Sequence, residues 1–133
     1  MRQIVRRTAL SAFSLALLAG AAVTMPAAIA AKGTAVIQTG NCSAASDWKL
    51  KVKPDNGAIE VEFEVDQNRV GKTWNVTLKH NGNVFWSGQK VTKAPSGSFT
   101  VHKMTGNAAG TDTFTARATN RVTGEVCLGS ASL

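Results

Sequence analysis

The side chains that could carry chemistry in this chain of 133 residues are few. There are two histidines, His80 and His102, and they lie far apart in the sequence, which is not the spacing of a metal-ligand set. Serines and threonines are frequent, but no Gly-x-Ser-x-Gly element is present to activate one of them as a nucleophile. We therefore predict no catalytic residue, no metal site and no cofactor.

The two cysteines, Cys42 and Cys127, lie near opposite ends of the segment that would fold. They do not form a Cys-x-x-Cys pair and have no histidine close in sequence, which disfavours a redox or metal site. An even number of cysteines in an exported chain is typical of a structural disulfide. A disulfide between two residues so far apart in the sequence would close a long loop and stabilise the fold by roughly 4–5 kcal/mol, as an upper estimate.

Acid–base and calcium chemistry are also disfavoured. Four of the eight acidic residues lie at alternate positions of one predicted strand, from Glu60 to Asp66, opposite a run of lysines. This arrangement offers neither a pair of acids across a cleft nor an Asp-rich loop that completes a calcium cage. We interpret Asp112 as a turn residue, His80 as a solvated residue beside a turn, and His102 as a residue of an outer sheet face.

Tryptophan is the better indication of a binding site. Trp48 and Trp74 alternate with polar residues in a way that predicts core positions. A two-residue Asn81-Gly82 turn would pair Thr77 with Trp86 and turn Trp86 outward, beside Lys79, whereas a three-residue turn would bury it. An exposed tryptophan in such a setting could stack on a sugar ring or anchor a protein partner, so we predict a ligand site at Trp86, Thr77 and Lys79.

The first thirty residues have the layout of a secretory signal peptide. A basic head of Arg2, Arg6 and Arg7 precedes an apolar run over residues 9–23, and the small-residue end fits cleavage after Ala30. The arginine pair also suggests twin-arginine export, but the rest of that motif is missing, so we favour general secretion. The apolar run is too short for a membrane span, so we expect a secreted, extracellular protein with residues 31–133 as its one domain.

The formal net charge of +7 overstates the charge of that domain. Three of the fifteen basic residues fall in the leader, and the remaining twelve exceed the eight acids by four. Because these charges are interleaved along the chain, they do not form the basic patch that a nucleic-acid partner needs.

Strand patterns dominate after residue 31, and they indicate seven main strands with a short leading strand at Val36-Ile37. The spacing predicts an all-β, immunoglobulin-like β-sandwich of about seven antiparallel strands. In the first main hairpin, a four-residue turn over residues 54–57 would pair Lys53 with Ala58. The cross-strand pairs that follow are Val52–Ile59, Leu50–Val61 and Trp48–Phe63 inside, with Lys51–Glu60 and Lys49–Glu62 outside.

Three short motifs support a family resemblance: the run Ala116–Gly129, His80-Asn81-Gly82 and Gly97-Ser98-Phe99. Together they resemble the sequences of small secreted proteins of actinobacteria with an immunoglobulin-like or fibronectin type III-like domain, over most of residues 42–133. The resemblance implies a single exported sandwich domain. That group has no established activity, so it implies no site residues. The enediyne-carrying apoproteins of actinomycetes are a second comparison, since they too are exported sandwich domains of similar size, but they are acidic and have two disulfides.

From these observations we expect a non-enzymatic secreted binding module for a cell-envelope polymer or an extracellular protein. Two alternatives stay open. One is a carrier of a small apolar ligand, which needs a pocket between a sheet face and the loops over residues 67–72 and 105–110. The other is a structural or interaction protein that assembles through its edge strands.

Overall fold

The computed structural model describes residues 33–133, so the predicted signal peptide and its cleavage site lie outside the described residues. Eight strands and the turns between them make up this part of the chain, and it contains no helix that could cross a membrane. The strands are β1 (Val36–Asn41), β2 (Asp47–Asp55), β3 (Ala58–Asp66), β4 (Thr73–His80), β5 (Asn83–Val91), β6 (Ser98–Gly106), β7 (Thr113–Asn120) and β8 (Val126–Ser132).

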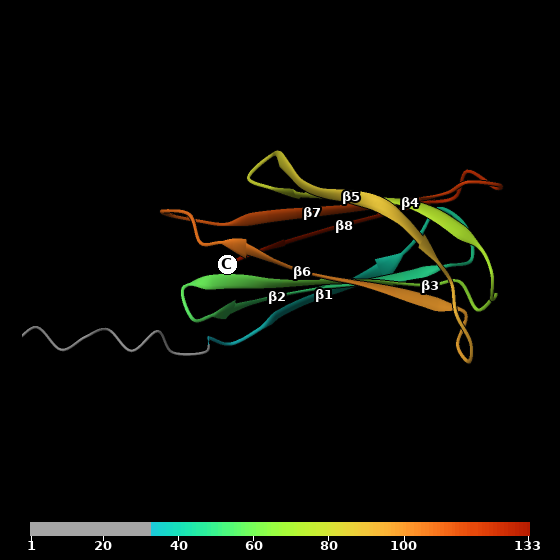
Figure 1. The fold of residues 1–133 in the computed structure, drawn as a ribbon, viewed down its shortest axis with the longest axis horizontal. Coiled ribbons are helices and arrows are strands. Elements are labelled where there is room, and N and C mark those ends of the chain that lie inside the picture. The colour runs from blue at the N-terminus through green and yellow to red at the C-terminus, as the bar shows by residue number, and fades with distance from the viewer. Residues whose placement is uncertain (1–32) are drawn as a thin grey trace, which may run out of the picture.

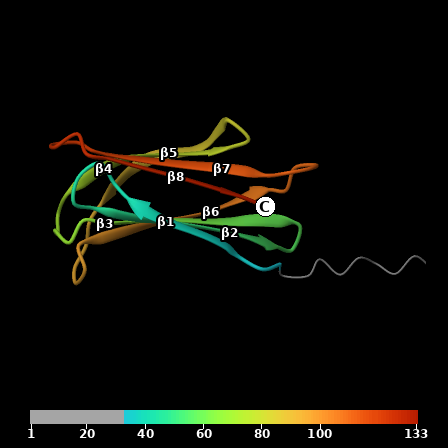
Figure 2. The same cartoon turned by 180° about the vertical axis from the view of Figure 1, so that it is seen from behind.

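The strands form two four-stranded antiparallel sheets, in the orders β1-β2-β3-β6 and β5-β4-β7-β8. Figures 1 and 2 show the two sheets as stacked layers. At one edge of the stack β8 contacts β1 and β2, and at the other edge β5 contacts β6. This arrangement confirms the predicted all-β sandwich and is compatible with an immunoglobulin-like fold. The leading strand is longer than predicted, since it continues to Asn41.

The core lies between the sheets and follows the alternation of the sequence. Inward-facing residues of both sheets are buried, as the period of two in each strand requires. Trp74 is fully buried, as predicted, and its Nε1 donates a hydrogen bond to Oε1 of Gln67 at 3.0 Å. Trp48 packs against the core but is only half-buried. The largest fully buried side chains are Trp74, Phe63, Phe114, Leu50, Ile59 and Leu78.

The hairpin between β2 and β3 has a different register from the predicted one. Lys53 lies opposite Glu60, not Ala58, and Asp55 lies opposite Ala58. The physical reason is the turn: Asn56 and Gly57 both have positive φ, at 50° and 81°, which is the backbone of a tight two-residue hairpin. The strands therefore continue through residues 54 and 55. Because the shift is two residues, each side chain keeps its predicted face, but no predicted pair of residues lies directly opposite. Lys51 and Glu60 are now diagonal neighbours and still form an ion pair, at 3.9 Å.

The hairpin between β4 and β5 has the predicted two-residue turn, with His80 opposite Asn83. The orientation predicted for Trp86 is nevertheless wrong. The register shifts after Lys79–Val84, so that Phe85 has no cross-strand partner and Trp86 lies opposite Leu78. This β-bulge turns Trp86 toward the inner face, where it is half-buried against the core.

The disulfide between Cys42 and Cys127 is present, as predicted. It joins the loop after β1 to the second residue of β8 and so links the two sheets near the ends of the described chain. The Cys127 side chain is fully buried.

Candidate functional site

The candidate site lies on the outer face of the sheet β5-β4-β7-β8, where two cationic side chains lie close together. Thr77 of β4 lies opposite Arg117 of β7, and Arg117 lies opposite Leu128 of β8. In the next outward-facing row, Lys79 lies opposite Thr115. These five side chains line a shallow hollow of about 340 Å³. The register therefore places two cations, two hydroxyls and one exposed aliphatic side chain around a single depression.

The charge of this face differs from that of the other sheet. None of the four strands of β5-β4-β7-β8 contains an aspartate or a glutamate, whereas β2 and β3 together carry six of the eight acids of the chain. Lys79 and Arg117 are exposed, and within residues 33–133 neither has a carboxylate within 4.0 Å. Both cations are therefore available to an anionic ligand.

Only two of the three predicted ligand-binding residues lie on this face. Thr77 and Lys79 line the hollow, but Trp86 lies on the inner side of the same sheet. Nζ of Lys103 in β6 is 5.1 Å from the centroid of the Trp86 ring, a cation–π geometry across the edge of the sandwich. The structure thus separates Trp86 from the other two residues, and Arg117, Thr115 and Leu128 take its place.

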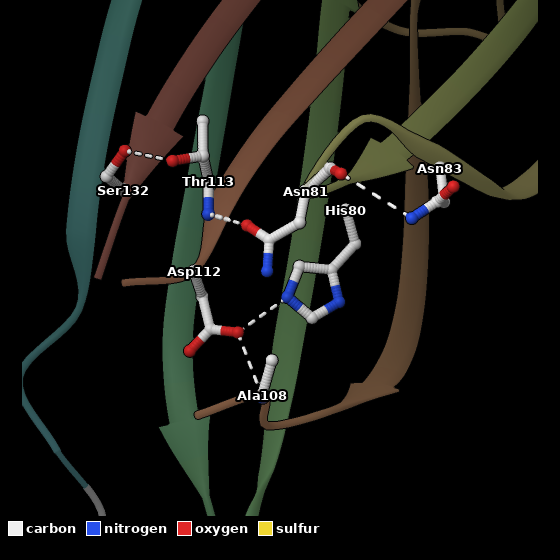
Figure 3. Close-up of polar contacts among 7 residues, drawn as sticks. All are labelled: His80, Asn81, Asn83, Ala108, Asp112, Thr113 and Ser132. Carbon is white, nitrogen blue, oxygen red and sulfur yellow. Dashed lines mark hydrogen bonds and ion pairs between the residues drawn. The ribbon is translucent and has the colours of Figure 1, made fainter. Parts of the chain in front are cut away.

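Sequence reasoning missed a second cluster, at the end of the sandwich that contains the β4–β5 turn (Figure 3). Nε2 of His80 lies 2.6 Å from Oδ1 of Asp112, which also accepts a hydrogen bond from the Ala108 backbone at 3.0 Å. The His80 ring stacks on Phe114, with centroids 4.5 Å apart. The prediction of a solvated His80 is wrong, because its side chain is only 13% exposed. Asp112 lies in the loop before β7, in line with its prediction as a turn residue, but it is buried.

The signal that could have found this pair is the alternation of the two strands. His80 continues the inward series of Trp74, Val76 and Leu78, and Asp112 is in phase with Phe114. Next to the pair, Asn81 Oδ1 accepts a hydrogen bond from the backbone N–H of Thr113. The cluster links the loop before β7 to the end of β4. Among the described residues no hydroxyl is hydrogen-bonded to His80, so the cluster does not have the geometry of a nucleophile and its base.

At the opposite end of the sandwich, Glu125 organises the loop that carries the disulfide. Its Oε2 accepts hydrogen bonds from the backbone N–H groups of Ala44 and Ser46, and its Oε1 accepts one from the Ser46 hydroxyl. A hollow of about 350 Å³ lies beside this carboxylate, and Gln67, Arg69 and Lys72 also line it.

The loops of the apolar-carrier alternative are placed far apart. Asp66 lies opposite Ser98, and Ala58 lies opposite Gly106. The loop over residues 67–72 and the loop after Gly106 therefore lie at opposite ends of the sheet, and within residues 33–133 they do not bound a common pocket.

Comparison of the chain with protein-family models, with curated proteins and with solved structures found no match.

Proposed function

We propose that this protein is a secreted, non-enzymatic binding module that holds an anionic cell-envelope polymer on the outer face of β5-β4-β7-β8. The observation that carries the proposal is that Lys79 and Arg117, two cations without an ion-pair partner among residues 33–133, lie around one hollow on a sheet whose strands have no acidic residue. A guanidinium can bind a phosphate or carboxylate with two parallel hydrogen bonds, and a lysine adds a point charge.

The remaining groups of the hollow suit the backbone of such a polymer. The Thr77 and Thr115 hydroxyls can donate and accept hydrogen bonds to sugar or polyol oxygens. Leu128, which is 58% exposed, offers an apolar contact at the rim. A flat sheet face with a shallow hollow suits an extended chain better than a compact small molecule, which proteins usually enclose in a deep pocket.

The sequence features support the cellular setting of this proposal. The basic head, apolar run and Ala28-Ile29-Ala30 end favour export, and a disulfide fits an oxidising compartment. A domain with an excess of four positive charges would also be retained near an acidic wall by long-range attraction. The resemblance to small secreted actinobacterial proteins is consistent with such a wall.

Co-sedimentation of the purified, oxidised protein with insoluble polymers tests the proposal. Three kinds of insoluble material are compared. They are bacterial cell wall that retains its phosphate- or carboxylate-containing polymers, the same wall after chemical removal of those polymers, and the neutral polysaccharides cellulose and chitin. We expect pelleting only with the intact wall and release as salt rises, because exposed charges are screened over about 8–10 Å near physiological ionic strength.

Two charge-matched double variants identify the face. K79A/R117A should abolish pelleting, whereas K49A/K53A, which removes the same charge from the other sheet, should leave most of it. Equal losses in both variants would mean that net charge and not this face holds the polymer. If neither the variants nor the wild-type protein pelleted, the polymer would be excluded as the ligand. A secreted protein partner would then be the alternative.

A further inference from the structure

A histidine and two glutamates converge on the outer face of the other sheet, β1-β2-β3-β6. Glu62 of β3 lies directly opposite His102 of β6, and Glu60 is two positions before Glu62 on the same face. Nε2 of His102 is 3.3 Å from Oε1 of Glu60. One ligand atom from each of the three residues can be chosen so that all three lie within 4.8 Å of one another.

The donor set, one imidazole nitrogen and two carboxylate oxygens, is one that borderline divalent ions use in proteins. Ligand atoms around a tetrahedral ion at about 2.0–2.2 Å lie about 3.3–3.6 Å apart. To bind such an ion, the distances between the three ligand atoms must therefore shorten by at most about 1.5 Å. His102 is exposed and the two glutamates are half-buried on a solvated face, so small rotations of these side chains can make that change.

A cation already occupies the position between the two carboxylates. Nζ of Lys51, from the neighbouring strand β2, lies 3.2 Å from Oε2 of Glu62 and 3.9 Å from Oε1 of Glu60. The electrostatic field of the two glutamates at this point is thus favourable to positive charge. A metal ion would have to displace the Lys51 ammonium, which can swing away because its side chain is only partly covered.

We infer that Glu60, Glu62 and His102 form a surface site for a borderline divalent transition-metal ion such as Zn²⁺ or Cu²⁺, with Lys51 as an internal competitor. Water would complete the coordination on the solvent side. The imidazole distinguishes the site from a calcium site, because Ca²⁺ takes six to eight oxygen ligands. The inference is independent of the polymer face, which lies on the opposite sheet.

Isothermal titration of the untagged, oxidised protein with ZnCl₂, CuCl₂ and CaCl₂ tests this site. We expect one Zn²⁺ or one Cu²⁺ per chain, with Cu²⁺ bound more tightly in line with the general order of divalent affinities, and no binding of Ca²⁺. H102A and E62Q should each weaken Zn²⁺ binding by about tenfold or more, since even loss of an outer-shell partner commonly costs that much.

Two further variants keep the test specific. E64Q removes the same charge from the next outward position of β3 and should leave Zn²⁺ affinity unchanged. K51Q should bind Zn²⁺ more tightly than wild type, because it removes the competing ammonium. No binding of Zn²⁺ and Cu²⁺ by wild type would overturn the site, and so would unchanged affinity in H102A. Equal losses in E62Q and E64Q would do the same, because they would indicate diffuse attraction to the acidic face.

Discussion

Nε2 of His80 lies 2.6 Å from Oδ1 of Asp112, and this contact joins the end of β4 to the loop that precedes β7. With Asp112 ionised, the ring nitrogen that faces it is the donor of this hydrogen bond, because a carboxylate only accepts. The carboxylate is buried, and its one other recorded hydrogen bond among the described residues comes from the Ala108 backbone. The contact with His80 therefore determines whether the buried carboxylate of Asp112 has a side-chain partner that compensates for its loss of solvation.

Removal of His80 should accordingly destabilise the domain. We expect H80A to lower the free energy of unfolding by about 3 kcal/mol, because it leaves Asp112 without its partner and removes the ring stacked on Phe114. Chemical denaturation followed by tryptophan fluorescence measures the change. H102A is the matched control, since the exposed His102 should change stability by less than about 0.5 kcal/mol. Similar small effects in both variants would contradict a stabilising role for the pair.

The alternation of the strands carried most of the fold prediction. It correctly assigned the buried faces of β2, β3, β4 and β7, because each face repeats every two residues and depends on no neighbour. The disulfide was predicted from the even number of cysteines and the predicted signal peptide, and the structure contains it. The register of β2–β3 was not predicted correctly, because Pro54 and Asp55 resemble turn residues. The strands in fact continue through them to Asn56 and Gly57, the two residues with positive φ.

The candidate site was harder to predict than the fold, for a local reason. One unpaired residue in β5, Phe85, reverses the face of every side chain that follows it on that strand, and a bulge of this kind has no clear pattern in the sequence. Trp86 consequently moved from the expected binding face to the core side. Thr77 and Lys79 stayed where they were predicted because β4 is a regular strand, whereas Arg117 and Leu128 joined them through sheet order, which periodicity does not reveal.

Trp86 offers a direct test of that reversal. We expect W86A to lower the free energy of unfolding by about 2 kcal/mol, because it removes apolar area packed against the core and the contact with Lys103. Pelleting with cell wall, measured on the folded fraction, should persist, since the ring is absent from the hollow at Thr77. A variant with wild-type stability and no wall binding would mean that Trp86 faces the ligand after all.

Glu125 is expected to support the disulfide loop independently of the covalent bond. E125A should cost about 2–3 kcal/mol, because the buried Ser46 backbone N–H loses its acceptor together with two further hydrogen bonds. E125Q retains an amide oxygen and should cost less. Denaturation of both variants with the disulfide intact separates this effect from loss of the cross-link. Equal destabilisation by the two substitutions would show that the charge, not the acceptor geometry, holds the loop.

Gly129 shows how the edge between the two sheets is closed, and it gives the sharpest packing test. Trp48 of β2 extends across this edge, and a Cβ built on Gly129 of β8 would lie 2.7 Å from its Cζ3 atom. Because aromatic ring atoms cannot yield as a flexible chain end does, G129A should force Trp48 to shift and cost about 1–3 kcal/mol. G106A is the control, since its added Cβ would meet no atom within 4 Å and its φ is not in the left-handed region. Thermal denaturation of the two variants should therefore show a clear loss for G129A and little change for G106A. If both variants unfolded at the wild-type temperature, the close packing of Trp48 against β8 would be contradicted.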